Sequence, residues 1–204
     1  LPWEQPKLIV NAGRLSRGPW RIAAALDNRG LLCSQQFFGL WPSEALSCTQ
    51  LLTFAAILNS PVANAFLSVH SPAKGMRISA VAQIPLPSVL PYYAGELVAE
   101  YVRLLMKPTA LIQNEERVEA LLTQIDAAVL GAYDLPARLE RQLLYHFHGV
   151  ERPVAHPWQH WDAYDPTPGL TLSERASGRF QAHGSWIQRV FQPLPNEEAK
   201  LLRT

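Results

Sequence analysis

The excess of basic over acidic side chains lies in the first part of this 204-residue chain. Residues 1–90 contain seven Lys or Arg and three Asp or Glu, whereas residues 91–150 contain five and eight, and residues 151–204 contain six of each. A guanidinium group can donate two parallel hydrogen bonds to a phosphate or to the edge of guanine. The local excess therefore indicates an anionic partner, although the net charge of the whole chain is only +1.

The loop at residues 12–18 is the preferred contact element. Its glycines permit close approach of the backbone, and Arg14 and Arg17 flank the hydroxyl donor of Ser16. Gln35 and Gln36 could read adenine, and a solvated surface is the competing interpretation for all of these side chains. The candidate contact residues are Lys7, Arg14, Ser16, Arg17, Arg21, Arg29, Lys74 and Arg77.

A second cluster near the end of the chain could do metal chemistry. It consists of His146, His148, His156, His160, Asp162 and Asp165, interleaved with Trp158 and Trp161. Imidazole and carboxylate groups bind zinc or iron, but such ligands need fixed spacing on a rigid element, and these residues flank prolines. The alternative is that the two tryptophans anchor an irregular arm while the polar groups face water. We predict no metal site here.

Sequence motifs for catalysis or cofactor binding are absent. The chain has no GxGxxG, GxxxxGK[ST], HExxH or GxSxG segment. Cys33 and Cys48 lack the spacing of a zinc ribbon, and we expect them to be buried thiols. We therefore predict no catalytic residue and no cofactor in this chain.

Strand-like segments come first along the chain. They cover residues 8–10, 20–25, 31–33 and 37–41, with turn-forming residues at 27–30 that predict a hairpin between the second and the third. A helix is expected from near Ser43 or Ser47 to Asn59, and Ser60-Pro61 can begin another. Residues 76–79 are predicted to be extended, and the prolines at 84–87 favour extended geometry.

Three amphipathic helices are expected beyond the prolines. Apolar residues recur with helical spacing over 97–105, 118–129 and 139–147, which predicts a small bundle or hairpin. The fold class is thus α+β: a small twisted antiparallel sheet with packed helices (1–91), a helical segment (92–150) and an irregular arm (151–204). The longest apolar stretch, at 51–58, is too short to cross a bilayer, so we expect a cytoplasmic location without membrane contact.

Several of these motifs, in this order, resemble a known family. They are PKLIVNAGR at 6–14, WRIAAALD at 20–27, FFGLWP at 37–42, LLTFAAILNSP at 51–61, and RIS at 77–79 followed by IPLP at 84–87. The chain resembles the carboxy-terminal specificity region of N6-adenine DNA methyltransferases, related to the target recognition domains of type I restriction specificity subunits. The resemblance covers residues 6–90, and residues 95–147 fit the helical segment that follows in that family.

The resemblance implies a reader of double-stranded DNA in adenine methylation or restriction. The methyltransferase motif Asn/Asp-Pro-Pro-Tyr/Phe does not occur here, so S-adenosylmethionine is expected in a separate catalytic domain, in cis or on a partner subunit. The start at Leu1 suggests a piece of such a longer protein. Two alternatives remain: a protein-interaction module that docks a partner through residues 95–147, and a small metal-dependent enzyme built on the His/Asp cluster.

Overall fold

The computed structural model describes residues 2–13, 15, 18–71, 75–106, 115–150, 152 and 171–176. Three strands and seven helices occur in this part of the chain. In order they are β1 (Lys7–Asn11), β2 (Ala24–Asp27), β3 (Phe37–Leu40), α1 (Cys48–Asn59), α2 (Pro61–His70), α3 (Ile78–Val81), α4 (Tyr92–Leu105), α6 (Glu115–Tyr133), α7 (Ala137–Tyr145) and α8 (Leu172–Ala176). The α+β class expected from the sequence is confirmed.

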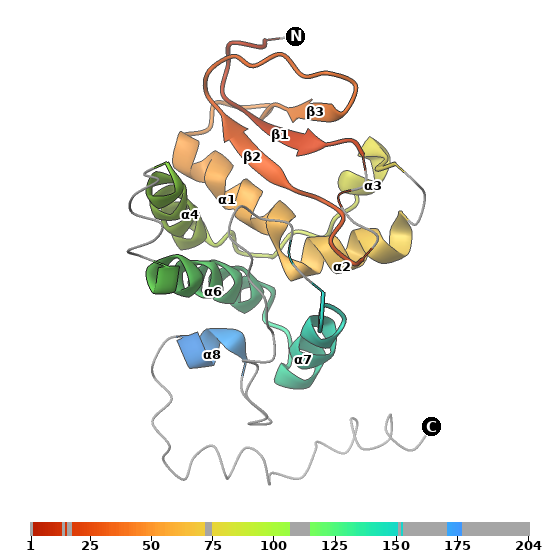
Figure 1. Cartoon of the computed structure of the whole chain (residues 1–204), viewed down its shortest axis with the longest axis vertical. Helices are drawn as coiled ribbons and strands as arrows, with labels where there is room; N and C mark the ends of the chain where they lie inside the picture. Colours follow the sequence, from red (N-terminus) through yellow and green to blue (C-terminus); the bar gives the residue numbers. More distant parts are fainter. Residues whose placement is uncertain are drawn as a thin grey trace, which may run out of the picture.

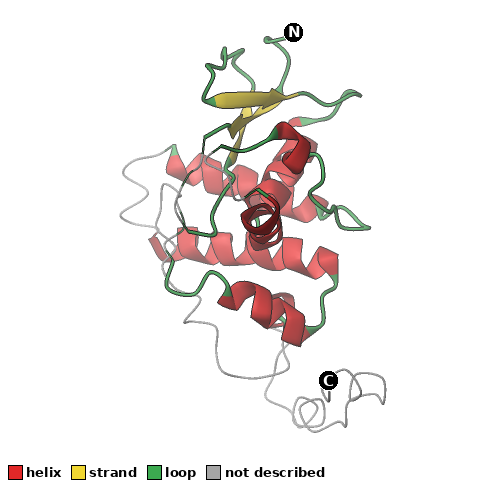
Figure 2. Ribbon diagram, turned by 90° about the vertical axis from the view of Figure 1, so that its right-hand side faces the viewer, coloured by secondary structure: helices red, strands yellow, loops and turns green. Residues whose placement is uncertain are grey.

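The small sheet has the strand order β2-β1-β3, and both pairings are antiparallel. Lys7 is opposite Asp27 in one pair, and Leu8 is opposite Leu40 in the other. Leu8 and Val10 are buried in a core shared with α1, as expected for alternate residues on one face of a strand. The sheet forms one layer and the helices lie beneath it (Figures 1 and 2).

Three local expectations for this region were wrong. Residues 31–33 form no strand, so residues 27–30 do not close the hairpin expected between 20–25 and 31–33, and β2 pairs with β1 instead. Residues 78–81 form one turn of helix, where an extended segment was expected at 76–79. The two thiols also differ, since Cys33 is half-buried and Cys48 is exposed. Each of these features depends on contacts between distant segments, which short-range patterns do not contain.

The helix boundaries at 47 and 60 are confirmed and have local causes. The Ser47 hydroxyl accepts from the backbone of Gln50, and the Gln50 side chain accepts from the backbone of Ser47, which is a capping box. The Ser60 hydroxyl accepts from the backbone N–H of Ala63 and so caps α2, and Pro61 occupies the first position of that helix. α1 and α2 meet at a bend of 52°. No single described helix is long and apolar enough to span a membrane. Among the described helices, only α1 and α2 taken together reach the required length and apolar composition.

Asparagine side chains at this bend bind the backbone of the segment that leads into β2. Asn59 accepts from the backbone N–H of Ala24 at 2.7 Å and donates to its carbonyl at 2.9 Å. The amide oxygen of the buried Asn64 accepts from Arg21 at 2.6 Å and from Ile22 at 2.9 Å. These side chains satisfy backbone groups of residues 21, 22 and 24 that would otherwise need another partner.

The helical segment shares its core with the first part of the chain. Ala56 and Ile57 of α1 pack against Leu97 of α4 and against Leu121 and Val129 of α6. α4 lies along α1 in Figure 1, and at Gly95 the two backbones approach so closely that a Cβ would overlap the Thr49 carbonyl and the Thr53 hydroxyl. α1 is therefore covered by the sheet on one side and by α4 and α6 on the other.

Asn64→Ala should lower the free energy of unfolding by about 3 kcal/mol, because it leaves buried backbone N–H groups without acceptors. Urea unfolding measures the change. The exposed Asn28→Ala is the control and should change stability by less than about 0.5 kcal/mol. Equal effects of the two substitutions would contradict the structural role given to Asn64.

Gly95→Ala tests the close contact between α1 and α4. Helix propensity alone would make this change stabilising by about 1 kcal/mol, whereas overlap with α1 should make it destabilising by about 1–3 kcal/mol. Ala99→Gly, at an exposed position of the same helix, should cost about 1 kcal/mol through propensity alone. A stabilised Gly95→Ala variant in thermal unfolding would show that the helices do not approach at this point.

Candidate nucleic-acid interface

Three loops meet at one end of the sheet, where β1 ends and β3 begins. Gly13 forms an antiparallel bridge with Gly75, and the backbone N–H of Met76 donates to the Ala12 carbonyl at 2.9 Å. The N–H of Ala12 donates in turn to the Gln36 carbonyl at 2.7 Å. We call this region the glycine-bridged end. It brings the loop after β1 next to a segment more than sixty residues later in the sequence.

The glycine-bridged end holds several of the candidate contact residues. Arg77 is exposed directly after the bridge, and Gln35 and Gln36 are exposed beside it. Arg21 also lies at this end, because its carbonyl accepts from the Asn11 side chain at 2.9 Å, and its side chain is half-buried. The other candidates from these loops, which lie outside the described residues, are Arg14, Ser16, Arg17 and Lys74.

Arg29 lies at the opposite end of the sheet. It follows β2 in a turn where the Asp27 carboxylate accepts from the backbone N–H groups of Arg29 and Leu31, each at 2.9 Å. Gly30 supports this turn with a φ of 78°, a value that glycine adopts readily. Arg29 is exposed, but β1 separates it from the glycine-bridged end.

Lys7 is not available to a partner in this structure, which corrects its assignment as a contact residue. Its side chain is fully buried, its ammonium group pairs with the Asp27 carboxylate, and it donates to the Trp3 carbonyl at 2.7 Å. Trp3 and Trp41 also lie within 6 Å of the ammonium group, at 5.6 and 5.9 Å from their ring centroids. Lys7 therefore fixes the N-terminal segment on the sheet.

Opposite charges are separated along the sheet. The three carboxylates of the first ninety residues are Glu4, Asp27 and Glu44. Asp27 is opposite Lys7 at the start of β1, and Glu4 lies beside Gly30. Glu44 follows Leu40, the last residue of β3, which is opposite Leu8 near the start of β1. Among these carboxylates none lies at the glycine-bridged end. The charged side chains of residues 1–90 that the structure describes at this end are those of Arg21 and Arg77.

One residue that the sequence did not single out belongs to the same end. Phe37 pairs with Asn11, and its side chain is 46% exposed. An exposed ring next to Gln35 and Gln36 can contact the methyl group of thymine or the sugar of a nucleotide. Alternation within β3 could have indicated it, since Phe37 and Phe38 must face opposite sides of the sheet.

The His/Asp cluster falls mostly outside the described residues, and no group of three metal-binding side chains occurs within them. The Nε2 atom of His146 lies 3.0 Å from the Ser68 hydroxyl, and the ring of His148 stacks on Tyr145. These two histidines contact different neighbours. His156, His160, Asp162 and Asp165 are not described.

Comparison with known proteins gave no match among family models, curated proteins or solved structures.

Asp27→Asn should destabilise the protein at neutral pH, because Lys7 would keep a buried charge without its carboxylate. The hydrogen bond from Lys7 holds the pKa of Asp27 below its ordinary value of 3.8. The stabilisation is therefore present above that value and is lost as the pH falls through the lowered pKa of the folded state.

Urea unfolding at about pH 7 and about pH 3 measures this difference. The difference in free energy of unfolding between the wild type and Asp27→Asn should be smaller at the lower pH. Asp134→Asn is a matched control at an exposed carboxylate whose φ of 51° asparagine tolerates. If Asp27→Asn lowered the free energy of unfolding equally at both pH values, the role of the ion pair would be contradicted.

Proposed function

We propose that this chain is the DNA target recognition region of an N6-adenine DNA methyltransferase or restriction-modification protein. The observation that carries the proposal is the glycine-bridged end. Arg21 and Arg77 lie there, while the three carboxylates of the first ninety residues lie at the other end of the sheet. The ordered motifs that resemble this family support the same assignment.

The residues at this end divide into two chemical roles. The arginine and lysine side chains bind phosphates and position the domain on the duplex, which is where most of the affinity and its salt dependence arise. Gln35 and Gln36 suit the paired donor and acceptor of adenine in the major groove, and Phe37 suits a thymine methyl group. The glycines at 13 and 75 leave room for the DNA backbone.

The chemical step belongs to a separate domain in this proposal. A catalytic domain, in cis or on a partner subunit, would bind S-adenosylmethionine and transfer its methyl group to adenine. This chain contributes the choice of DNA site. The rigid base for that choice is the pair of helices α1 and α2, whose asparagines hold the segment around Arg21 in place.

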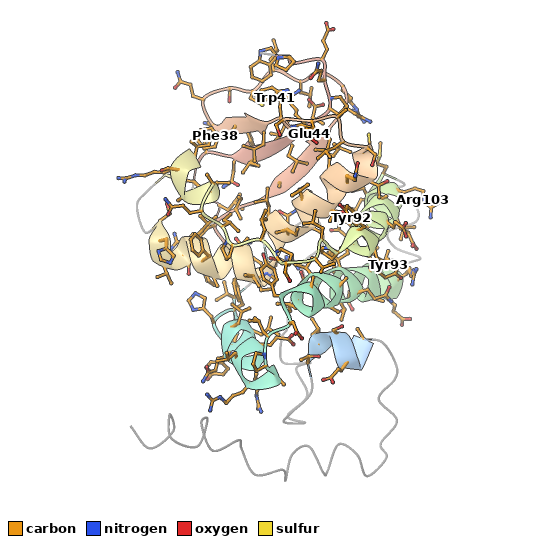
Figure 3. All side chains as sticks on the ribbon, turned by 180° about the vertical axis from the view of Figure 1, so that it is seen from behind. Phe38, Trp41, Glu44, Tyr92, Tyr93 and Arg103 are labelled. Atoms are coloured by element: carbon orange, nitrogen blue, oxygen red, sulfur yellow. The ribbon has the colours of Figure 1, made fainter. Side chains whose placement is uncertain are left out.

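A second candidate is a module that docks a partner subunit through residues 95–147. Its support is the apolar surface of α4, where Val102 and Met106 are exposed near the end of the helix. Tyr92, Tyr93 and Arg103 lie along the same helix (Figure 3), and the two tyrosines are exposed. Docking by α4 is compatible with DNA binding at the glycine-bridged end, because the two surfaces lie on different elements.

Binding of mixed-sequence duplex DNA across a salt series tests the proposed function. The variant Arg14→Ala/Arg17→Ala/Arg77→Ala should bind at least about tenfold more weakly, and its salt dependence should be shallower by roughly 0.9 in slope per lost phosphate contact. Fluorescence anisotropy measures both quantities.

Arg29→Ala is the matched control, since it removes one exposed arginine from the opposite end of the sheet. It should leave affinity within about twofold of the wild type. An equal loss in Arg29→Ala would overturn the proposed surface. Absence of binding even at low ionic strength would remove support for DNA recognition by this chain and favour the docking module.

A further inference from the structure

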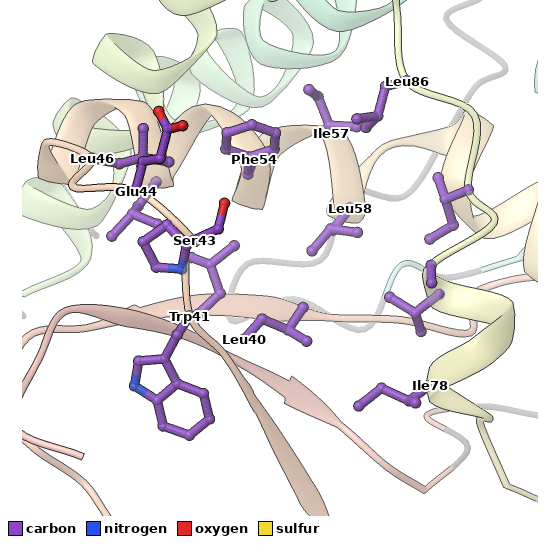
Figure 4. A pocket seen from close by; sticks show the side chains of 16 residues that line it. Leu40, Trp41, Ser43, Glu44, Leu46, Phe54, Ile57, Leu58, Ile78 and Leu86 are labelled. Carbon is purple, nitrogen blue, oxygen red and sulfur yellow. The ribbon is translucent and has the colours of Figure 1, made fainter. Parts of the chain in front are cut away.

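An apolar cavity of about 540 Å³ lies between the β3 side of the sheet and α1. The sheet contacts α1 mainly through β2, whose backbone is bonded to Asn59. On the other side, the loop after β3 and the short helix α3 line a space between the sheet and α1 that is open to the surface. Figure 4 shows Leu40, Leu58 and Ile78 around this space.

The cavity walls are almost entirely aliphatic and aromatic. Leu40 of β3, Phe54 and Leu58 of α1, and Ile78 of α3 contribute to different sides. The rim is also apolar: Ile78 is 52% exposed and Leu86 is 56% exposed. Large apolar side chains left in contact with water at the mouth of an apolar cavity are typical of a binding site.

Glu44 is the charged residue that lines the cavity. Its side chain is exposed and lies at the mouth of the cavity, in the loop between β3 and α1. Ser43 is its polar neighbour, and Figure 4 shows both at the same side, away from Ile78. A ligand that fills the cavity would therefore be apolar along most of its length and would carry a positive charge at the Glu44 end.

β3 adds a second kind of recognition. It is an edge strand, and within the described residues no strand pairs with its outer side. An edge strand presents unpaired N–H and C=O groups in the periodic pattern that an extended peptide matches. Leu40 and Phe38 are alternate residues of this strand, and both pair with residues whose side chains face α1. The open edge and the cavity are therefore adjacent.

We propose that β3 and this cavity together bind an extended apolar segment of a partner protein. The segment adds to the edge of β3 as a further strand, and its alternate apolar side chains enter the cavity between Leu40, Phe54 and Ile78. A lysine or arginine of the segment pairs with Glu44. A peptide accounts for the edge, the cavity and the charge together, whereas a small apolar molecule would use the cavity alone. This inference does not depend on the proposed DNA-binding function.

Selection of phage-displayed random peptides against the full chain tests this inference. Enriched peptides should carry apolar residues at alternate positions with a nearby lysine or arginine. Synthetic copies should bind the Ile78→Asp/Leu86→Asp variant at least about tenfold more weakly. Both residues are more than half exposed, so these substitutions should leave the fold intact, as circular dichroism would verify. Val69→Asp, at a more exposed apolar site on α2, is the matched control and should bind normally.

A modified peptide and a further protein variant test strand addition and the charge pairing separately. N-methylation at alternate peptide residues should abolish binding, because it removes donors to the β3 edge, and Glu44→Gln should weaken peptides that contain lysine or arginine by about fivefold. Failure to enrich any peptide would overturn the inference, as would peptides that bind Ile78→Asp/Leu86→Asp and Val69→Asp equally. Peptides that tolerate every N-methyl group would overturn strand addition.

Discussion

The rest of the structure depends on one set of hydrogen bonds. The side chains of Asn59 and Asn64 make them with the backbone before and within β2. A buried N–H or C=O without a partner costs as much as a lost hydrogen bond. Among the described residues, no strand lies on the outer side of the segment at 21–24 to supply such a partner. Amide side chains at the bend between α1 and α2 take that place. They fix the sheet to the helices at the β2 edge, and the apolar cavity lies at the β3 edge.

The same bend is also bonded from the helical side. Arg152 donates to the carbonyl of Asn59 at 2.7 Å and to both oxygens of Asp126 on α6, and its guanidinium lies 4.7 Å from the ring of Trp20. Burial raises the pKa of Asp126, and the charge and hydrogen bond of Arg152 oppose that rise. A buried carboxylate of this kind is tolerated when its oxygens are bonded. One arginine thus links α1, α6 and the segment before β2.

Burial decides what each basic residue can do. Lys7 and Arg152 are enclosed with carboxylates and hold segments together, whereas Arg77 and Arg29 project into solvent at opposite ends of the sheet. All four are equivalent in a count of charge. Only the exposed groups can release counterions from DNA, so the proposed interface depends on the pairing of strands as much as on composition.

The sequence alone determined the features whose causes are local. The capping residues Ser47 and Ser60, the proline at 61 and the apolar stripes beyond residue 92 predicted the helices well, because each acts within one or two turns of chain. Tertiary structure decided the order of the strands, the helical turn at 78–81, the burial of Lys7 and the meeting of Gly13 with Gly75. These depend on partners far away in the chain, such as Asp27 for Lys7 and Asn59 for Ala24. A residue type does not reveal its distant partner, because the same lysine is stable in water or beside a buried carboxylate, and only the packing of the whole chain selects between the two.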